Sequence, residues 1–392
     1  DVATAAQIGG AIVENGLASG DHADTWTQSG GQLIASSMLI ARSLEKGGDL
    51  VTVQKILARL AADPHAIRSA KLGQYQKAAL DEFLAAADSP ETAASVAFSA
   101  LRMMSRMMVP EITGAFCRKS NVPVVLKRKQ MVIFRVQPKY ASVVLPLVSA
   151  CVEIMLQRNV FSGNDIGGLA LLDELPQYRL PTLHKIAAVA RSKKWIFCYG
   201  AQGEQILESE YGKARCKAIL ENCKTIALMA LNSNSTAQDY SKALGEEDVS
   251  TKSRSSGHSG SSTSTQESRR PLIPVQRLQQ QPTGHALLLT PTVEAKIEGE
   301  DAIRVPYWHQ FVIPPQELRA MDRAKANWLK WRPIAIANSR AKPLSEDELY
   351  GRELLVNSIL PNSPKKDKNN SNSSNSSKVK ETLRDLFSAK TS

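Results

Sequence analysis

The sequence predicts an α/β protein with a parallel sheet, joined to an all-helical domain. Between residues 29 and 117, apolar side chains recur at helical spacing and no stretch alternates as a strand does. From residue 118 onward, short apolar runs alternate with amphipathic segments, which is the order of strands and helices in a parallel sheet. A length of 392 residues agrees with more than one domain, because one domain usually has roughly 100–200 residues.

The helical domain is expected at residues 29–117. Leu33 and Ile40 place apolar side chains on one face of a helix. Pro90 follows Ser89, and proline is favoured at the first position of a helix.

The α/β domain is expected at residues 118–312. Its most informative segment is the run 169–172, which is apolar at every position, as in a strand buried on both faces of a parallel sheet. The expected strands of the domain are 122–126, 131–136, 169–172, 195–199, 225–230, 286–289 and 303–307. The expected helices between them are 142–159, 183–191, 211–221 and 237–244.

The amino-acid sequence also predicts the character of three further segments. Residues 249–270 are rich in Ser and Thr, which predicts a flexible linker. Residues 313–360 are expected to be a C-terminal helical segment, with a charged amphipathic helix at 318–331. Residues 361–392 are dominated by Lys, Asn and Ser, which predicts a disordered polar tail.

Positive charge is concentrated just after the helical domain. Lys and Arg (49) outnumber Asp and Glu (38), and seven cations without an acid lie between Arg118 and Lys139. Two interpretations stay open: a surface that tracks the phosphate backbone of nucleic acid without reading its sequence, or an ordinary solvated surface. The candidate nucleic-acid contacts are Arg118, Lys119, Lys127, Arg128 and Lys129.

Composition also excludes several classes of protein. A hydrophobic content of 43% excludes a wholly disordered or collagen-like chain, and five scattered cysteines without a CxxC pair indicate reduced thiols. The chain begins at Asp1 without a signal peptide, so we expect a soluble piece of a longer protein. The apolar stretch 140–156 contains Pro146 and Glu153 and is shorter than the ~20 residues of a spanning helix, which favours a buried helix.

Two neighbouring carboxylates, Asp173 and Glu174, follow the apolar run 169–172. Ligands bind at the carboxyl edge of a parallel sheet, where the first acid of such a pair can hold Mg²⁺ and the second can polarise an attacking water. Gln202 follows the next expected strand, where an amide can sense a terminal phosphate. For each of these residues the alternative is an ordinary loop, and short motifs do not decide between the two.

Arg191 precedes Ser192 and two lysines at the end of an expected helix. It is either an arginine finger that completes the site of a neighbouring subunit or a cation that complements the helix dipole. The phosphate-binding loop GxxxxGK[ST], which a nucleotide site of this kind requires, is absent from the 392 residues. Either that loop lies upstream of Asp1 or the site is inactive.

Several short motifs occur in an order that is more specific than any one of them. They are Thr25-Trp26-Thr27, Met131–Pro138, Leu171–Pro176, Ala190-Arg191-Ser192, Gly200-Ala201-Gln202, Tyr211-Gly212, Ser241–Gly245, Arg269–Leu272 and Thr283–Leu289. With these motifs the chain resembles the TraG/TraD-like coupling proteins of conjugation and type IV secretion. One departure is Leu175-Pro176, which stands where that family usually has Phe and a small residue.

The resemblance implies half of a RecA-like P-loop NTPase with residues 1–28 as its leading segment, together with the all-α domain. It also implies ATP and Mg²⁺ as cofactors, Asp173 and Glu174 as the Walker B pair with Asp173 on Mg²⁺, Gln202 as sensor and Arg191 as finger.

By the same resemblance, the intact protein would be a hexameric ATPase at the cytoplasmic face of the bacterial inner membrane. It would link the relaxosome, a complex of DNA and relaxase, to the secretion channel and drive DNA transfer. Two alternatives stay open. One is a non-catalytic docking module that recruits relaxosome or substrate proteins, and the other is a different RecA-like DNA translocase or helicase.

Overall fold

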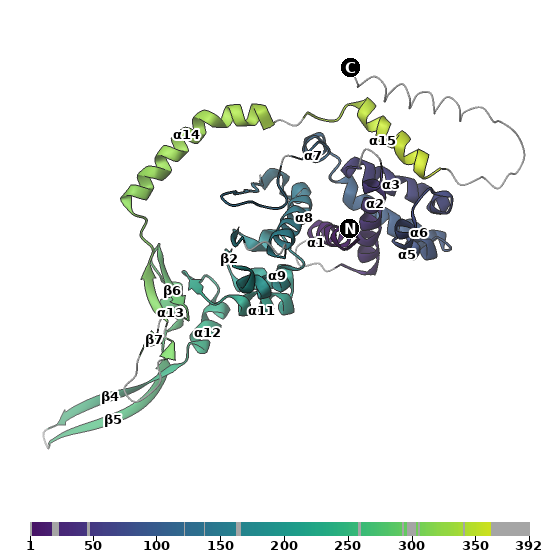
Figure 1. Ribbon diagram of the computed structural model, residues 1–392. Helices are drawn as coiled ribbons and strands as arrows, with labels where there is room; N and C mark the ends of the chain where they lie inside the picture. The colour runs from purple at the N-terminus through teal and green to yellow at the C-terminus, as the bar shows by residue number, and fades with distance from the viewer. Residues whose placement is uncertain are drawn as a thin grey trace, which may run out of the picture.

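The computed structural model has a helical body at the N-terminal side, an α/β region beside it and a projecting arm of antiparallel strands (Figure 1). It describes residues 2–17, 23–44, 48–120, 122–136, 138–161, 166–257, 260–291, 294–295, 303–304, 306–339 and 342–361. The polar tail expected at 361–392 lies outside the described residues except for residue 361.

The helical domain is confirmed, since the described residues between 25 and 116 form helices joined by short turns. The helices are α2 (Thr25–Arg42), α3 (Leu50–Ala62), η1 (Pro64–Ser69), α4 (Gln74–Ala78), α5 (Asp81–Ala86), α6 (Pro90–Ser105) and α7 (Pro110–Phe116). Asp24 and Asp49 begin α2 and α3 by accepting hydrogen bonds from the backbone N–H groups three residues on. Ile34 and Leu57 are among the fully buried side chains of their common core.

Both ends of the described chain pack on this helical body. Helix α1 (Val2–Gly16) contributes Ile12 to its core, so the leading segment that was expected to belong to the nucleotide domain shares the core of the helices. Helix α15 (Glu346–Ile359) contributes Val356. It is also held by the ion pair Arg352–Asp49, with a nitrogen–oxygen distance of 2.6 Å.

The α/β region is built on two parallel strands, β1 (Gly168–Leu172) and β2 (Trp195–Tyr199), paired from Gly168 with Trp195 to Leu172 with Tyr199. Its helices are α8 (Ala141–Val160), α9 (Leu183–Ala190), α10 (Glu204–Tyr211) and α11 (Lys213–Asn222), with the short turns η3 (Leu175–Gln177) and η4 (Arg191–Lys193). The strand–helix–strand order predicted for this part is therefore confirmed.

The prediction that residues 169–172 are buried on both faces is wrong for the described chain. Ala170 and Leu172 are buried against the helices, whereas Leu169, Leu171 and Ile196 on the opposite face are about two-thirds exposed (64%, 67% and 66%). Within the described residues, helices cover this sheet from one side, so every second side chain of each strand faces solvent.

Other expected strands differ from the structure because a strand requires a partner. Residues 122–126 and 131–136 are described and adopt no strand, and Met131 is 80% exposed. Strand β3 (Ile226–Leu228) exists but pairs antiparallel with β6 (His285–Leu289), which in turn pairs with β9 (Tyr307–Gln310). This second sheet has its own small core with α12 (Asn234–Ala243) and α13 (Val275–Gln279). Two short strands, β7 (Glu294–Ala295) and β8 (Ile303–Arg304), pair with each other.

The prediction of a flexible linker at 249–270 is also wrong, because the described residues of this segment belong to a long antiparallel hairpin. Strand β4 (Glu246–Gly257) pairs with β5 (Gly260–Pro271) along its full length (Figure 1). Ser and Thr are compatible with an extended backbone, and two cross-strand ion pairs, Arg269–Asp248 and Arg270–Glu247, lie at the base of the hairpin.

Two features complete the fold. Helix α14 (Pro315–Ser339) leads from the second sheet back toward α15 and its described side chains are exposed (Figure 1). Among the described residues, one helix, Pro138–Val160, is long and apolar enough to cross a membrane. That helix contains α8, whose 20 residues show that the expected length limit was wrong. The helix packs on the helical core through Leu147 and on the α/β core through Leu156.

Candidate functional site

The ends of β1 and β2 are tied together at the carboxyl edge of the parallel pair. The N–H of Gly200 donates to the carbonyl of Leu172 (2.9 Å), and the N–H of Leu175 donates to the carbonyl of Gly200 (2.8 Å). Asp173 and Glu174 lie between these anchors, so their backbone is fixed although Asp173 is exposed and Glu174 is half-buried. Glu174 has a φ of 52°, in the left-handed region, which turns the chain sharply at this point.

The absence of a side chain at Gly200 leaves space for the carboxylate of Asp173. A Cβ atom at this position would lie 3.0 Å from Oδ1 of Asp173, closer than ordinary van der Waals contact. The glycine therefore leaves room for the carboxylate beside the neighbouring strand.

The side chain of Tyr178 also holds this turn in place. Its hydroxyl donates to the carbonyl of Asp173 (3.1 Å). Burial, with the nearby charges of Asp173 and Glu174, raises the pKa of Tyr178 to about 12. The tyrosine therefore stays a neutral hydrogen-bond donor at physiological pH.

Gln202 reaches the acidic pair from the loop after β2. Its Nε2 donates to both carboxylate oxygens of Glu174, at 3.3 and 3.2 Å. The structure thus brings together three of the residues that the sequence singled out, Asp173, Glu174 and Gln202. The signal was the position of each residue directly after a parallel strand.

The donor chemistry of this edge suits Mg²⁺. Magnesium is usually held in nucleotide sites by one or two carboxylates, with phosphate oxygens and water as its other ligands. Asp173 and Glu174 supply two carboxylates, and in the described part of the chain no group of three or more metal-binding side chains occurs. The residues present can therefore hold Mg²⁺ together with a phosphate ligand, whereas a site made of protein ligands alone is not formed.

Arg191 lies at the other edge of the sheet. It begins the turn η4, which ends two residues before Trp195 opens β2, whereas the acidic pair follows the last residue of β1. Within one chain Arg191 does not join Asp173 and Glu174. The finger assignment stays a prediction that requires a second copy of the chain.

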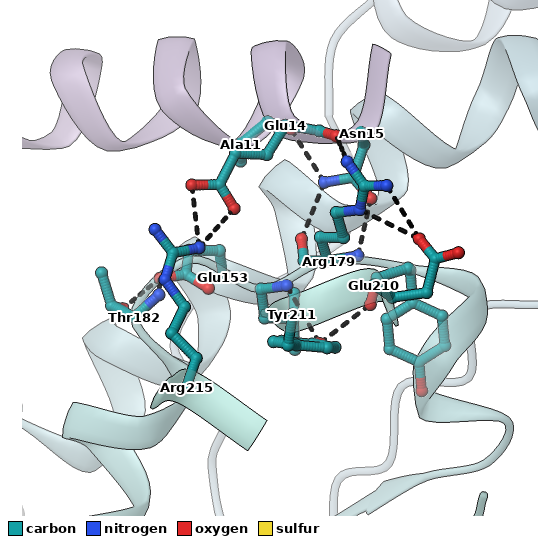
Figure 2. A network of polar contacts seen from close by, with 11 residues as sticks. Ala11, Glu14, Asn15, Glu153, Arg179, Thr182, Glu210, Tyr211 and Arg215 are labelled. Carbon is teal, nitrogen blue, oxygen red and sulfur yellow. Dashed lines mark hydrogen bonds and ion pairs between the residues drawn. The ribbon is translucent and has the colours of Figure 1, made fainter. Parts of the chain in front are cut away.

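A buried polar network fixes the segment between the acidic pair and α9 (Figure 2). The guanidinium of Arg179 donates to Oε2 of Glu210 through Nε (3.1 Å) and Nη2 (2.8 Å), and to the carbonyl of Glu14 through Nη1 (2.9 Å). The backbone N–H of Arg179 donates to Oδ1 of Asn15 (2.7 Å), whose Nδ2 donates back to the carbonyl of Arg179 (2.7 Å). The turn after the acidic pair is thereby attached to α1.

Two neighbouring contacts extend the network. Arg215 forms an ion pair with Glu14 (2.8 Å), and Thr182 donates through its hydroxyl and its backbone N–H to Glu153 (Figure 2). Burial raises the pKa of Glu153 above its ordinary value, and the second carboxylate oxygen of Glu153 has no hydrogen-bond partner in the described structure. Sequence reasoning missed the network because its members on α1 lie more than 130 positions from the rest.

The candidate nucleic-acid contacts fall into two places. Arg118 forms an ion pair with Glu348 of α15 (2.8 Å) and donates to the carbonyls of Lys342 and Pro343. Lys119 is exposed one residue further on. Lys127, Arg128 and Lys129 line a separate surface pocket at the start of β1 and β2.

Comparison with known proteins adds three findings. Residues 169–283 match the family model of the TraM recognition site of TraD and TraG. The conjugative coupling protein TrwB, in an unbound form, is similar with a TM-score of 0.55 and 14% identity, over 80% of this chain and 69% of that one. TrwB bound to the GTP analogue GDPNP and TrwB bound to ADP and Mg²⁺ each give a TM-score of 0.57 at 13% identity over the same shares. No curated protein sequence is significantly similar.

The matched residues contain β2, all of β1 except its first residue, the acidic pair and Gln202. Together with the TrwB-like fold, the family match confirms the resemblance of the chain to the TraG/TraD-like coupling proteins. The predicted fold class, a RecA-like α/β domain with an all-α domain, is confirmed by the same likeness.

Proposed function

We propose that the chain is part of a coupling ATPase of a conjugative or type IV secretion system. The observation that carries the proposal is the acidic pair at the carboxyl edge of the sheet, with Asp173 exposed and Glu174 in contact with Gln202. The likeness to TrwB supports it, because TrwB was solved with ADP and Mg²⁺. In this proposal ATP and Mg²⁺ are the cofactors, and hydrolysis drives DNA transfer.

Each residue of the edge has a separate task in the proposed reaction. Asp173 would hold Mg²⁺, which when bound would neutralise charge on the transferred phosphoryl group. Glu174 orients and polarises the attacking water. Gln202 would position the carboxylate of Glu174 and sense the terminal phosphate, while Tyr178 and Gly200 keep the turn of Asp173 in place.

In this proposal the phosphate-binding loop GxxxxGK[ST], which residues 1–392 do not contain, is supplied by another part of the protein. The exposed apolar face of β1 and β2, with Leu169, Leu171 and Ile196, supports this, because an α/β sheet normally has both faces covered. Cys198 lies on β2, two residues after Ile196, and is exposed. We therefore expect Cys198 to react readily with a thiol reagent in residues 1–392 and to be protected in a longer protein that contains the loop. Equal reactivity of Cys198 in the two proteins would contradict the prediction that this face of the sheet is covered in the longer protein.

The hydrolysis proposal is tested in that longer protein with Glu174→Gln. Turnover is expected to be lost while ATP binding is retained, because Gln keeps the size of Glu but cannot polarise water as a carboxylate does. Glu317→Gln on the exposed helix α14 is the matched control and should hydrolyse ATP normally. Unchanged hydrolysis in Glu174→Gln would remove the assignment of the pair.

The partners follow from the same proposal. The family description names recognition of TraM, so we propose a relaxosome protein as the partner of residues 169–283. The proposed assembly is a homo-hexamer at the cytoplasmic face of the inner membrane that passes DNA to the secretion channel.

A docking module without catalysis is the second candidate, and the absence of GxxxxGK[ST] from the sequence favours it. It predicts that the chain binds its relaxosome partner equally well with and without the upstream loop and ATP. A partner affinity that depends on ATP would favour the motor.

A further inference from the structure

Asn15 lies near the C-terminal end of α1 and faces the turn that follows the acidic pair (Figure 2). Its Nδ2 donates to the carbonyls of Ala11 (2.8 Å) and Arg179 (2.7 Å). Its Oδ1 accepts from the N–H of Arg179 (2.7 Å) and from the hydroxyl of Ser149 (3.0 Å). A primary amide has two donors and two acceptor sites, so these four bonds use its full capacity. The amide therefore holds both backbone polar groups of Arg179 at once.

Helix α1 gives this amide a fixed position. Ala11 and Ile12, one turn before it, are fully buried in the core of the helical body. Ser149, its other side-chain partner, lies on α8 and is only 1% exposed. A side chain attached to packed helices on both sides moves little, so Asn15 ties the turn to the helical body as well as to the sheet.

A short series of contacts leads from Arg179 to the acidic pair. The preceding residue, Tyr178, is held at its carbonyl by the hydroxyl of Tyr211 (2.9 Å). The hydroxyl of Tyr178 in turn donates to the carbonyl of Asp173 (3.1 Å). A displacement of the backbone at Arg179 therefore reaches Asp173 through a single side chain.

Glu174 needs such support because its own backbone conformation is unfavourable. Its φ of 52° lies in the left-handed region, which residues other than glycine keep only where the surroundings fix it. On the side of the sheet, the N–H of Leu175 donates to the carbonyl of Gly200 (2.8 Å), and the N–H of Gln177 donates to the carbonyl of Glu174 (2.9 Å). On the side of α1, the same turn is held by Asn15.

We infer that Asn15 is a positioning residue for the proposed hydrolysis, acting through Arg179 and Tyr178 on the acidic pair. The inference rests on the proposed function and adds to it a residue outside the matched range 169–283. Reacting groups must be held within about 0.5 Å of their productive positions, and Asn15 supplies part of that precision from the helical body.

The first test measures backbone hydrogen exchange in residues 1–392 without nucleotide. Asn15→Ala removes the four bonds of the amide. The matched control is Asn222→Ala at the exposed end of α11, which removes one bond of the same kind, from Nδ2 to the carbonyl four residues earlier (2.8 Å). The N–H groups of Leu175 and Gln177 report whether the turn is closed.

In Asn15→Ala, exchange at Leu175 and Gln177 should become about tenfold faster, because two hydrogen bonds to Arg179 are lost. Exchange in α3 should stay unchanged, and the control should exchange like the wild type in both regions. Wild-type exchange in the turn would overturn the inference. An equal acceleration in α3 would also overturn it, because it would show a general loss of stability.

The second test measures ATP hydrolysis in the longer protein that contains the phosphate-binding loop. Asn15→Ala should lower kcat about tenfold and leave KM for ATP within about twofold, because misplaced catalytic groups slow the reaction while the loop still binds the phosphates. Tyr178→Phe removes only the hydroxyl bond to Asp173. If Asn15 acts through Tyr178, the double variant should lose no more kcat than the more affected single variant. Multiplied losses would overturn this route.

Asn15→Asp distinguishes hydrogen bonding from packing. The new carboxylate keeps the size of the amide but presents an oxygen to the carbonyl of Arg179 in place of a donor. Protonation at lower pH restores one donor, so the deficit in kcat relative to the wild type should shrink as pH falls. Asn222→Asp should show no such recovery. A deficit that does not change with pH would contradict the role of the amide bonds.

The two tests separate this inference from the proposed function. A longer protein that hydrolyses no ATP would contradict the proposed function alone, because the exchange measurement requires no nucleotide. Wild-type kcat in Asn15→Ala, together with wild-type exchange in the turn, would contradict only the role of Asn15.

Discussion

Replacing Arg179 by Met should destabilise the chain strongly, because the guanidinium is buried and bonded on three sides. Its side chain is 8% exposed and that of its partner Glu210 is 14% exposed. The change leaves the carboxylate of Glu210 buried without its cation and removes the bond to the carbonyl of Glu14. Breaking one partner of a buried ion pair costs roughly 3–5 kcal/mol, and we expect a loss of that size in the free energy of unfolding.

Arg215→Met is the matched control because it removes the same side chain from the same network. Its ion pair with Glu14 is more exposed, at 40% and 23%. A pair of that kind contributes about 0.2–1 kcal/mol. Urea unfolding followed by circular dichroism measures both variants, and hydrogen exchange in α10 locates the change. A loss in Arg179→Met no larger than that in Arg215→Met would refute the view that this network attaches the turn to α1.

Two other predictions concern the buried carboxyl group of Glu153 and the close approach of Gly168 to Trp195. Burial raises the pKa of Glu153, so the folded protein binds this proton more tightly than the unfolded chain; stability should fall as pH rises from the unfolded pKa of 4.5 through the raised folded pKa. Glu153→Gln should remove that fall in thermal unfolding measured across pH, and an unchanged pH profile would show that Glu153 is not its source. Gly168→Ala should cost about 1–3 kcal/mol, since the new methyl would lie 2.5 Å from the ring of Trp195. Urea unfolding measures this cost, and wild-type stability would contradict the close approach.

Local sequence patterns were enough to predict the helical character of residues 29–117, the helices α8, α9 and α12, and the strands β1 and β2. Apolar spacing and helix-start residues such as Ser89-Pro90 act over a few positions, so they predict helices directly. The meeting of Gln202 with Glu174 was also predictable, because parallel strands end at one edge. The predicted helix at 211–221 corresponds to α11, which begins at Lys213 after Gly212 with its φ of 76°. Tyr211 instead ends α10, a helix that the sequence analysis did not predict.

The errors concern features that depend on distant partners. Residues 131–136 have the composition of a strand but adopt none, because pairing depends on another segment that the pattern does not contain. The Ser-rich run was expected to be flexible, yet its two halves pair with each other in a hairpin. Amino-acid composition does not specify which residues pair across such a hairpin. No local sequence pattern indicated a structural role for Arg179, because its hydrogen-bond partner Asn15 lies 164 positions away in the sequence.

In the proposed ATPase, Asp173 and Glu174 would face a magnesium-bound triphosphate at the carboxyl edge of β1. A crystal structure of a longer protein containing the phosphate-binding loop, with Mn²⁺ in place of Mg²⁺ and a non-hydrolysable ATP analogue, tests it directly. The anomalous signal of Mn²⁺ should lie about 2.0–2.2 Å from an oxygen of Asp173, or one water molecule further. A metal bound elsewhere, with both carboxylates turned away from the nucleotide, would contradict the proposed roles of Asp173 and Glu174.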